Sequence, residues 1–287
     1  MTVAAVSRCL DVLESLVGVA GGCELGDIAD RVDTPRSAVH RILATLMARG
    51  WVVQDESTQH YSLSLKLSTL AFRDLDVRLV TDVVQAILDE LARRTREYCR
   101  LGIVEGDTVA WVSRAQGAVN GLRYDADMGQ EVALHATATG KAWLATLPEE
   151  EAVRIVCARG FFAHLRLGPH AISTIDELRR QLAETRARGY AVAIEEAAPG
   201  IVALAATFRS DPRPGAAVAG TLSVAGPISR IPPERHAEIH AALAAAVASV
   251  EAVWQVRVRQ RGHGSGYGAR TARDITGHAE TTAEVRP

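Results

Sequence analysis

A short helix–turn–helix pattern followed by a hairpin constrains the fold of this chain more than any other feature of the sequence. Apolar residues recur at helical spacing across residues 25–32 and predict a short amphipathic helix. The turn Asp33-Thr34-Pro35 follows, in which Thr34 is a favourable N-cap and Pro35 suits the first helical position. A second helix is therefore predicted over about residues 35–49, and Gly50 ends it.

One helix precedes this pattern and two short strands follow it. Residues 3–17 place apolar side chains three and four positions apart, which predicts a helix with one buried face, made of Val3, Val6, Leu10, Leu13 and Val17. Two β-rich runs, 51–54 and 60–63, enclose a polar turn and predict a hairpin. This order predicts a mainly α-helical winged helix-turn-helix over residues 1–62, followed by a linker helix over 63–75.

The outer face of the second helix carries the side chains expected to contact DNA. Its apolar residues, Val39, Ile42, Leu43 and Leu46, share the inner face. The candidate DNA-binding residues are therefore those turned outward, with a wing histidine added: Arg36, Ser37, His40, Arg41, Thr45 and His60. Arginine can contact guanine through two hydrogen bonds, and the shorter polar side chains can bind bases or phosphates.

Charge supports this assignment only locally. The formal net charge of the whole chain is −2, so its overall charge gives no indication of nucleic-acid binding. Residues 35–54 nevertheless contain three arginines and no acidic residue. The alternative is that these polar residues form an ordinary solvated helix face, which the turn and the following wing disfavour.

Residues 76–255 are predicted to form a second, larger domain. Helices are expected at about 78–97, 137–147, 149–158, 175–188 and 233–253, and strands at 101–104, 108–113, 121–124, 190–194, 201–208 and 217–224. Strands and helices do not alternate strictly, which predicts an α+β domain with a mixed or antiparallel sheet flanked by helices. Residues 256–287 are rich in Gly, Arg and Thr, and we expect a disordered tail there.

Several classes of site are not expected. The four cysteines are far apart without CxxC spacing, so no metal site is predicted and a reducing cytoplasmic location fits best. No signal peptide or membrane span is expected, because charged and polar residues interrupt the apolar stretch 237–253. We also find no catalytic set and no cofactor loop. The sequence ATATGKA lacks the glycine and Ser/Thr of a phosphate-binding loop, so Lys141 is expected on the surface or in a local ion pair.

Four stretches resemble the IclR-type regulators. They are LGDIADRVDTPRSAVHRILATLMARGWV, beginning at Leu25, then LHATATGKAWLATL, RGYAVAIEE and GTLSVAGPISRI, beginning at Leu134, Arg188 and Gly220. The resemblance covers nearly all of residues 3–255, in matching order. It implies a GAF-like C-terminal domain that binds a small-molecule effector, and a homodimer or homotetramer on a palindromic double-stranded operator.

The resemblance also implies an effector site, although this chain departs from the family pattern there. The residues expected to line it are Leu122, Tyr124, Val132, Ala138, Thr139, Ala193, Ala203, Ser223 and Ala225. Ala193 stands where the family often has aspartate, Ala203 where it often has cysteine, and Ala225 where a second serine is expected. A site with few polar anchors suits a larger apolar ligand. We therefore expect an aromatic or otherwise hydrophobic effector; the alternative is a degenerate pocket that binds nothing.

These features predict a ligand-responsive transcription regulator, with repression favoured over activation. Ligand binding would act through the linker helix on the spacing of the two recognition helices. Two alternatives belong to other classes: a winged helix that contacts a protein partner, and a minor enzymatic activity of the C-terminal domain. The arginine-bearing, acid-free second helix argues against the first, and the missing catalytic set argues against the second.

Overall fold

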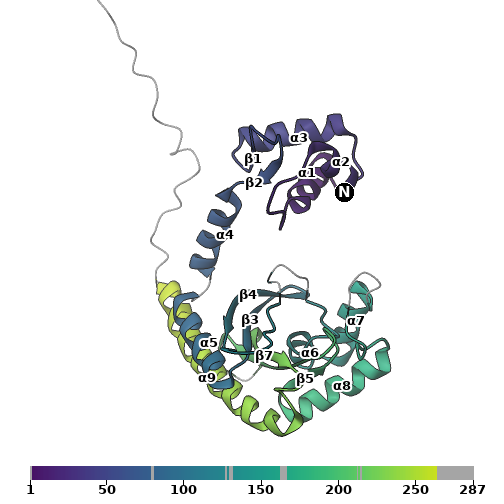
Figure 1. Cartoon of the computed structure of the whole chain (residues 1–287). Coiled ribbons are helices and arrows are strands. Elements are labelled where there is room, and N and C mark those ends of the chain that lie inside the picture. The colour runs from purple at the N-terminus through teal and green to yellow at the C-terminus, as the bar shows by residue number, and fades with distance from the viewer. Residues whose placement is uncertain are drawn as a thin grey trace, which may run out of the picture. The chain divides into compact units, whose positions relative to one another are not determined.

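The computed structural model describes residues 2–78, 81–126, 128, 132–161, 167–211, 213 and 215–263. The chain divides into two compact units, Met1–Leu79 and Val80–Pro287, here called unit 1 and unit 2. Figure 1 labels most of the helices and strands of both units along the chain. Each unit has its own hydrophobic core, so each is described by itself.

Unit 1 is a small helical unit with a two-stranded hairpin. Its elements are α1 (Ala4–Ser15), α2 (Leu25–Arg31), α3 (Arg36–Ala48), β1 (Val52–Gln54), β2 (Tyr61–Leu63) and α4 (Leu65–Arg78). β1 and β2 pair antiparallel, with Val53 opposite Ser62. The inner faces of the first three helices meet the hairpin in one core, which includes Val12, Ile28, Val39, Leu43 and Tyr61. This is the winged helix-turn-helix that the sequence predicts.

Two details of unit 1 differ from the prediction. Most of the predicted buried stripe of α1 is exposed: Val3, Val6, Leu10 and Val17 are 51–65% exposed, whereas the inner face is formed by Val12 and Leu16. Periodicity identifies residues that share a face, but it does not say what covers that face. Thr34 is also not the N-cap of α3; Pro35 is, and the Thr34 hydroxyl donates to the carbonyl of Val32.

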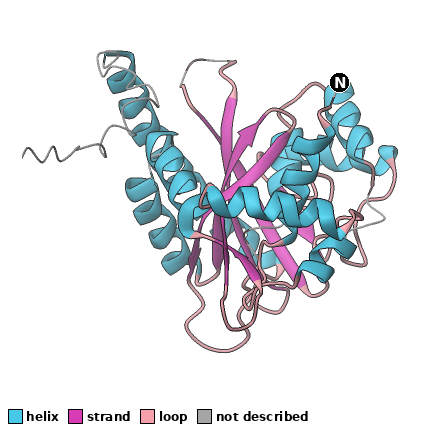
Figure 2. Ribbon diagram, turned by 90° about the horizontal axis from the view of Figure 1, so that it is seen from above, coloured by secondary structure: helices cyan, strands magenta, loops and turns pink. Residues whose placement is uncertain are grey.

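Unit 2 is built on a five-stranded antiparallel sheet in the order β4-β3-β7-β6-β5. Figure 2 shows helices on both sides of these strands. The strands are β3 (Tyr98–Glu105), β4 (Thr108–Gln116), β5 (Ala191–Ile194), β6 (Ile201–Arg209) and β7 (Val218–Pro227). The helices are α5 (Thr81–Thr95), α6 (Ala138–Leu144), α7 (Glu149–Arg159), α8 (Ile175–Arg188), the 3-10 turn η1 (Pro233–Arg235) and α9 (His236–His263).

The two faces of this sheet have different characters because strand side chains alternate. One face packs against α5 and α9 through large apolar residues such as Leu101, Leu204 and Leu222. The other lies against α6, where the side chains of β5 and β6 are small, as Ala193 and Ala205 illustrate. The antiparallel sheet and the helices on both faces confirm the predicted α+β class.

Two features of unit 2 and the linker helix of unit 1 differ from the expected elements. Residues 121–124 form a bend, in which the carbonyls of Leu122 and Tyr124 accept hydrogen bonds from the side chains of Arg230 and Gln116 instead of from a strand. α9 continues to His263, past the predicted start of the tail at residue 256; residues 264–287 lie outside the described residues. The linker helix is likewise longer than 63–75, since α4 ends at Arg78.

Among the described residues, one helical segment, Pro233–Trp254, is long and apolar enough to cross a membrane; it comprises η1 and most of α9. One side of this helix is part of the domain core, because Ile239, Leu243 and Val250 are fully buried. Their burial, together with the packing of α9 on β6, identifies α9 as a core helix of unit 2.

Candidate nucleic-acid interface and effector site

The outer face of α3 presents a continuous polar surface. Arg36, Ser37, His40, Arg41 and Thr45 are all exposed. The helix is anchored beneath them, because Val39 and Leu43 are fully buried in the unit 1 core. The Arg36 guanidinium lies close to Gly26 of α2, where an added Cβ would be 2.9 Å from it. The polar side chains are thus presented on a rigidly packed helix, which is the arrangement that a major-groove reading helix requires.

The wing is held in shape by a single carboxylate. Asp55 accepts hydrogen bonds from the backbone amides of Ser57 and Thr58 at 2.9 and 2.8 Å, and from both hydroxyls. These hydrogen bonds lower the pKa of Asp55 to about 2, and the bond from the Ser57 hydroxyl has the largest effect. His60 lies at the base of the wing, where Nδ1 is 3.1 Å from the Gly21 carbonyl oxygen and Nε2 is 3.7 Å from Glu24. The exposed tip is therefore formed by residues 56–59 instead of His60.

The predicted effector residues of the sheet lie together on the α6 face. One register row joins Tyr98 of β3 to Ala225, Ala203 and Ala193 on successive strands. The next row joins Arg100 to Ser223, Ala205 and Ala191. A third row places Gly102 beside Thr221 and Thr207. Small side chains thus occupy most of this face.

The remaining predicted residues are placed differently from one another. Ala138 and Thr139 begin α6 and are buried, Ala138 packing in one cluster with Ala193 and Ala205. Val132 is buried in the neighbouring core, whereas the Tyr124 ring meets the Tyr98 ring edge-on at 5.7 Å between centroids. Leu122 is 73% exposed, so its side chain does not line the α6 face in this structure.

Sequence reasoning missed one residue on this face, Arg100. It is 6% exposed, and its guanidinium carbon is 3.5 Å from the centroid of the Trp111 ring. Burial lowers the pKa of Arg100, while Tyr124 and Tyr98 oppose that shift. The predicted strand began at Leu101, so Arg100 fell outside it. Strand alternation extended one residue earlier would have placed Arg100 on the face of Ser223.

Lys141 forms a buried ion pair that the sequence did not suggest. Its side chain is fully buried, and Nζ lies 2.7 Å from each carboxylate oxygen of Glu196 and 2.5 Å from Gln181. Burial lowers the pKa of Lys141 and raises that of Glu196, since it opposes both charges. The expectation of a surface position or a local pair was therefore wrong, because the partner lies 55 residues further along the chain.

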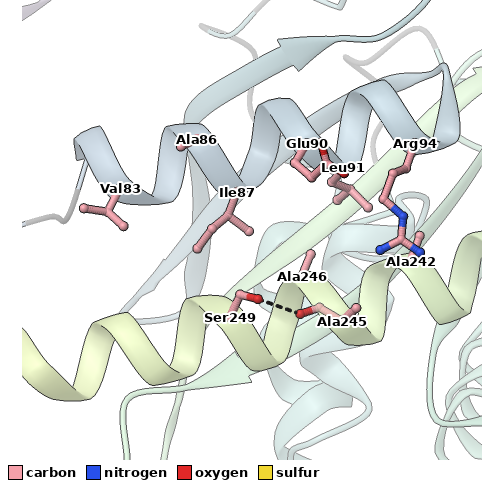
Figure 3. Close-up of a pocket in the computed structure, with 10 residues that line it drawn as sticks. All are labelled: Val83, Ala86, Ile87, Glu90, Leu91, Arg94, Ala242, Ala245, Ala246 and Ser249. Atoms are coloured by element: carbon pink, nitrogen blue, oxygen red, sulfur yellow. Dashed lines mark hydrogen bonds between the residues drawn. The ribbon is translucent and has the colours of Figure 1, made fainter.

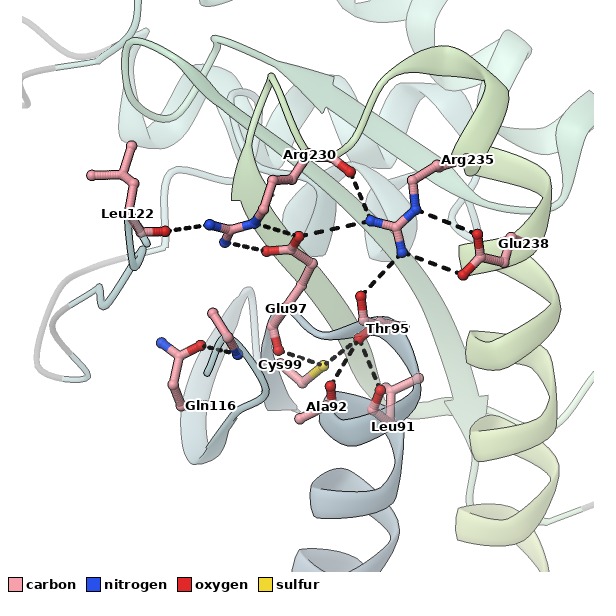
Figure 4. Close-up of polar contacts among 11 residues, drawn as sticks. Leu91, Ala92, Thr95, Glu97, Cys99, Gln116, Leu122, Arg230, Arg235 and Glu238 are labelled. Atoms are coloured by element: carbon pink, nitrogen blue, oxygen red, sulfur yellow. Dashed lines mark hydrogen bonds and ion pairs between the residues drawn. The ribbon is translucent and has the colours of Figure 1, made fainter. Parts of the chain in front are cut away.

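A second charged cluster surrounds the start of β3 (Figure 4). Glu97, whose side chain is 1% exposed, accepts two hydrogen bonds from Arg230 at 2.8 and 2.6 Å. Arg235 lies 3.8 Å from the same carboxylate and donates to the carbonyl of Thr95. Arg230 also donates to the carbonyl of Leu122. This cluster ties the 121–124 bend to the end of α5 and to the start of β3.

A groove on the opposite side of the sheet is not built for recognition. It lies between α5 and α9, has a volume of about 300 Å³, and is lined largely by small or apolar side chains, including Ala86, Ile87, Ala242 and Ala246 (Figure 3). Among the described residues that line it, no buried polar atom lacks a hydrogen-bond partner. The groove follows from the packing of the small side chains of α9 against α5.

Comparisons with known proteins agree across both units. Residues 5–56 match the model of the IclR helix-turn-helix domain, and residues 72–252 match the model of the bacterial transcriptional regulator IclR C-terminal domain. The chain is 33% identical over 217 residues to the probable transcriptional regulator SauR of Cupriavidus necator, covering 75% of this chain and 84% of that protein. It is 30% identical to the transcriptional repressor IclR of Escherichia coli, covering 83% and 85% of the two chains. A crystal structure of an IclR transcriptional regulator from Alicyclobacillus acidocaldarius superposes with a TM-score of 0.73, at 28% identity, covering 89% of this chain and all of that one.

Proposed function

Because the chain belongs to the IclR family of bacterial transcriptional regulators, which are not enzymes, we propose that it binds a palindromic DNA operator as a homodimer or homotetramer and responds to a small-molecule effector held in unit 2. The observation that carries the proposal is the exposed polar face of α3 above a fully buried apolar face. The transcriptional repressor IclR of Escherichia coli and a further relative, the acetate operon repressor of Salmonella typhimurium, are repressors by name, so we expect repression in the cytoplasm.

The DNA-binding half of the proposal depends on the exposed arginines of α3. The test is a mobility shift on the DNA upstream of the protein's own gene and its neighbours, with excess competitor DNA. We expect specific retention, and Arg41→Ala should weaken it by about 1–3 kcal/mol if Arg41 contacts a base. Arg8→Ala, which removes an exposed arginine of α1, is the matched control and should bind normally. Equal losses for both variants would mean that α3 has no special role.

The homodimer half rests on an exposed apolar surface of unit 1. Val3, Val6, Leu10 and Val17 form a stripe along α1, and on α4 Leu65 and Phe72 are 82% and 70% exposed. Soluble proteins seldom leave such surfaces open, and a second copy of the chain would bury them. We expect sedimentation to give a dimer or tetramer, and Leu10→Glu to lower the assembly state or weaken DNA binding. A wild-type monomer would contradict this part of the proposal.

The effector half rests on the α6 face of the sheet. Ala193, Ala203, Ser223 and Ala225 converge there with Thr139, so residues distant in sequence form one surface of small side chains. An effector that binds there would change operator affinity only through a difference in its affinity for two arrangements of the protein. The measurement is the same mobility shift with candidate metabolites added. If a metabolite binds the protein but leaves the mobility shift of the operator unchanged, that metabolite is a ligand and not an effector.

A further inference from the structure

Arg100 is a buried cation without an acidic partner among the described residues. It lies on the α6 face of the sheet, and no described carboxylate comes within ion-pairing distance of it. Arg114, directly opposite on β4, is paired with Asp125 at 3.3 Å. Removing a charge from water is costly unless it is paired, and arginine cannot avoid the cost by losing its proton at neutral pH. The position therefore has a charge that the described protein does not balance.

The Arg100 guanidinium is packed against aromatic rings and not against acidic side chains. The Arg100 guanidinium carbon is 3.5 Å from the centre of the Trp111 ring and 5.6 Å from that of Tyr98. Such contacts offset part of the burial cost and fix the plane of the guanidinium. The Tyr124 side chain also hydrogen-bonds to the guanidinium, which opposes the lowering of its pKa by burial. Nε of Arg100 is buried without a hydrogen-bond partner among the described residues.

Two more buried polar atoms beside Arg100 are also unsatisfied in the described part of the chain. They are the indole nitrogen of Trp111 and the hydroxyl of Thr221. Trp111 and Thr221 lie on either side of Gly102, which follows Arg100 on the same face of β3. Native proteins leave few buried polar atoms unpaired, and three at neighbouring positions call for a shared cause. All three can donate a hydrogen bond, so an acceptor-rich group satisfies them together.

The neighbouring strands cannot supply that acceptor group. Ser223 stands opposite Arg100 on β7, and Ala205 follows on β6. Neither side chain carries a charge, and both are short. Gly102 keeps the backbone beside Thr221 bare, since an added Cβ would lie 2.6 Å from the Thr221 hydroxyl and 3.5 Å from Thr139 at the start of α6.

We propose that Arg100 binds the carboxylate of the effector, with Thr221 and Trp111 donating further hydrogen bonds. The inference rests on the proposed function, because it takes the α6 face as the effector site. It names the ligand class as a carboxylic acid whose remaining part is apolar, since the side chains beyond Arg100 on this face are alanines, which pack against Ala138 and Ala142 of α6. A guanidinium grips a carboxylate through two parallel hydrogen bonds, and Trp111 and Tyr98 favour a flat ligand beside it.

The test compares acids with their neutral amides on the full-length protein. Benzoate, phenylacetate and hexanoate are each titrated beside benzamide, phenylacetamide and hexanamide, with the melting temperature and tryptophan fluorescence as readouts. We expect at least one acid to raise the melting temperature and bind about tenfold or more tightly than its amide. Equal binding of an acid and its amide, or no response to any of the acids, overturns the proposal.

Substitutions of single arginines test whether the preference for the acid over its amide depends on Arg100. Arg100→Gln should lose the preference for the acid, whereas Arg93→Gln, which removes an exposed arginine of α5, should keep it. An Arg100→Gln protein that folds and still prefers the acid overturns the assignment. If that variant does not fold, the acid–amide comparison on the wild-type protein still decides. Acid binding that leaves operator retention unchanged supports the anion site and counts against the effector role of the proposed function.

Discussion

Lys141 and Arg100 are both buried cations of unit 2, and their surroundings differ in one respect. Lys141 has Glu196 within 2.7 Å and Gln181 within 2.5 Å, so its charge is balanced inside the protein. Arg100 has aromatic rings and unsatisfied donors around it, but no acid among the described residues. A buried pair of this kind is part of the fold, whereas a buried charge without a partner is a place for a ligand.

Lys141→Met should give the largest loss of stability. It leaves Glu196 buried without its cation, and removal of one partner from a buried pair costs about 3–5 kcal/mol. Chemical denaturation gives the free energy of unfolding. The double variant with Glu196→Leu should recover much of the loss, because no buried charge then remains. Arg180→Gln is the control: it breaks an exposed pair with Glu184 and should cost less than about 0.5 kcal/mol. If Lys141→Met and Arg180→Gln lower the free energy of unfolding by similar amounts, the Lys141–Glu196 pair does not stabilise the fold in the way proposed, and the contrast with Arg100 is lost.

Glu97→Gln should destabilise unit 2 by a smaller amount. Glu97 is a buried anion that pairs with Arg230 and lies near Arg235. Because both arginines are partly exposed, their guanidinium groups can be solvated by water when the Glu97 carboxylate is replaced by a neutral amide. We expect a loss of about 2–4 kcal/mol in the free energy of unfolding. Hydrogen exchange should also rise at the 121–124 bend, since Arg230 holds the Leu122 carbonyl. Unchanged exchange there would show that the bend does not depend on the cluster.

His135 is a third buried titratable group of unit 2, and it differs from Lys141 and Arg100 because it is buried in its neutral form. Burial, followed by the nearby charge of Lys141, lowers its pKa to about 4, from an ordinary value of 6.5. Between these values the unfolded chain holds the proton and the folded protein does not, so stability falls as the pH drops from about 6.5 towards 4. The loss reaches at most about 3–4 kcal/mol, at about 1.36 kcal/mol per pKa unit. Unfolding of wild type and His135→Asn across this range tests it: the variant should lose less stability on acidification. Equal slopes would contradict the lowered pKa.

The sequence predicted what depends on local patterns. α8 follows Thr174, whose hydroxyl accepts from the Glu177 amide, and it ends at Gly189 in a left-handed conformation, so helix 175–188 could be placed correctly. The outward face of α3 also followed from the positions of its buried residues. In both regions the information lies within one or two helical turns of the chain.

Features that depend on distant partners could not be predicted in this way. The pairing of Lys141 with Glu196 spans 55 residues, and no local spacing signals it. The α1 stripe was placed inside because the periodicity of a single chain shows which residues share a face, but not whether that face is buried or exposed. To predict that Arg100 is buried at the effector face, one would have to know both where β3 starts and which face of the sheet α6 covers. The alanines of the effector face could be listed by resemblance, but the charge beside them could not.

Arg100→Met should have the smallest effect on the ligand-free protein, and this sharpens the contrast with Lys141. The substitution removes an unpaired buried charge and keeps a side chain of similar length against Trp111. The lost cation–π contact costs about 1–2 kcal/mol, and the relieved desolvation offsets it, so the free energy of unfolding should change by less than about 1 kcal/mol. Denaturation of the ligand-free variant beside Lys141→Met measures both under the same conditions. A loss as large as that of Lys141→Met would mean that Arg100 is already balanced within the fold, and the two buried cations would then have the same structural role.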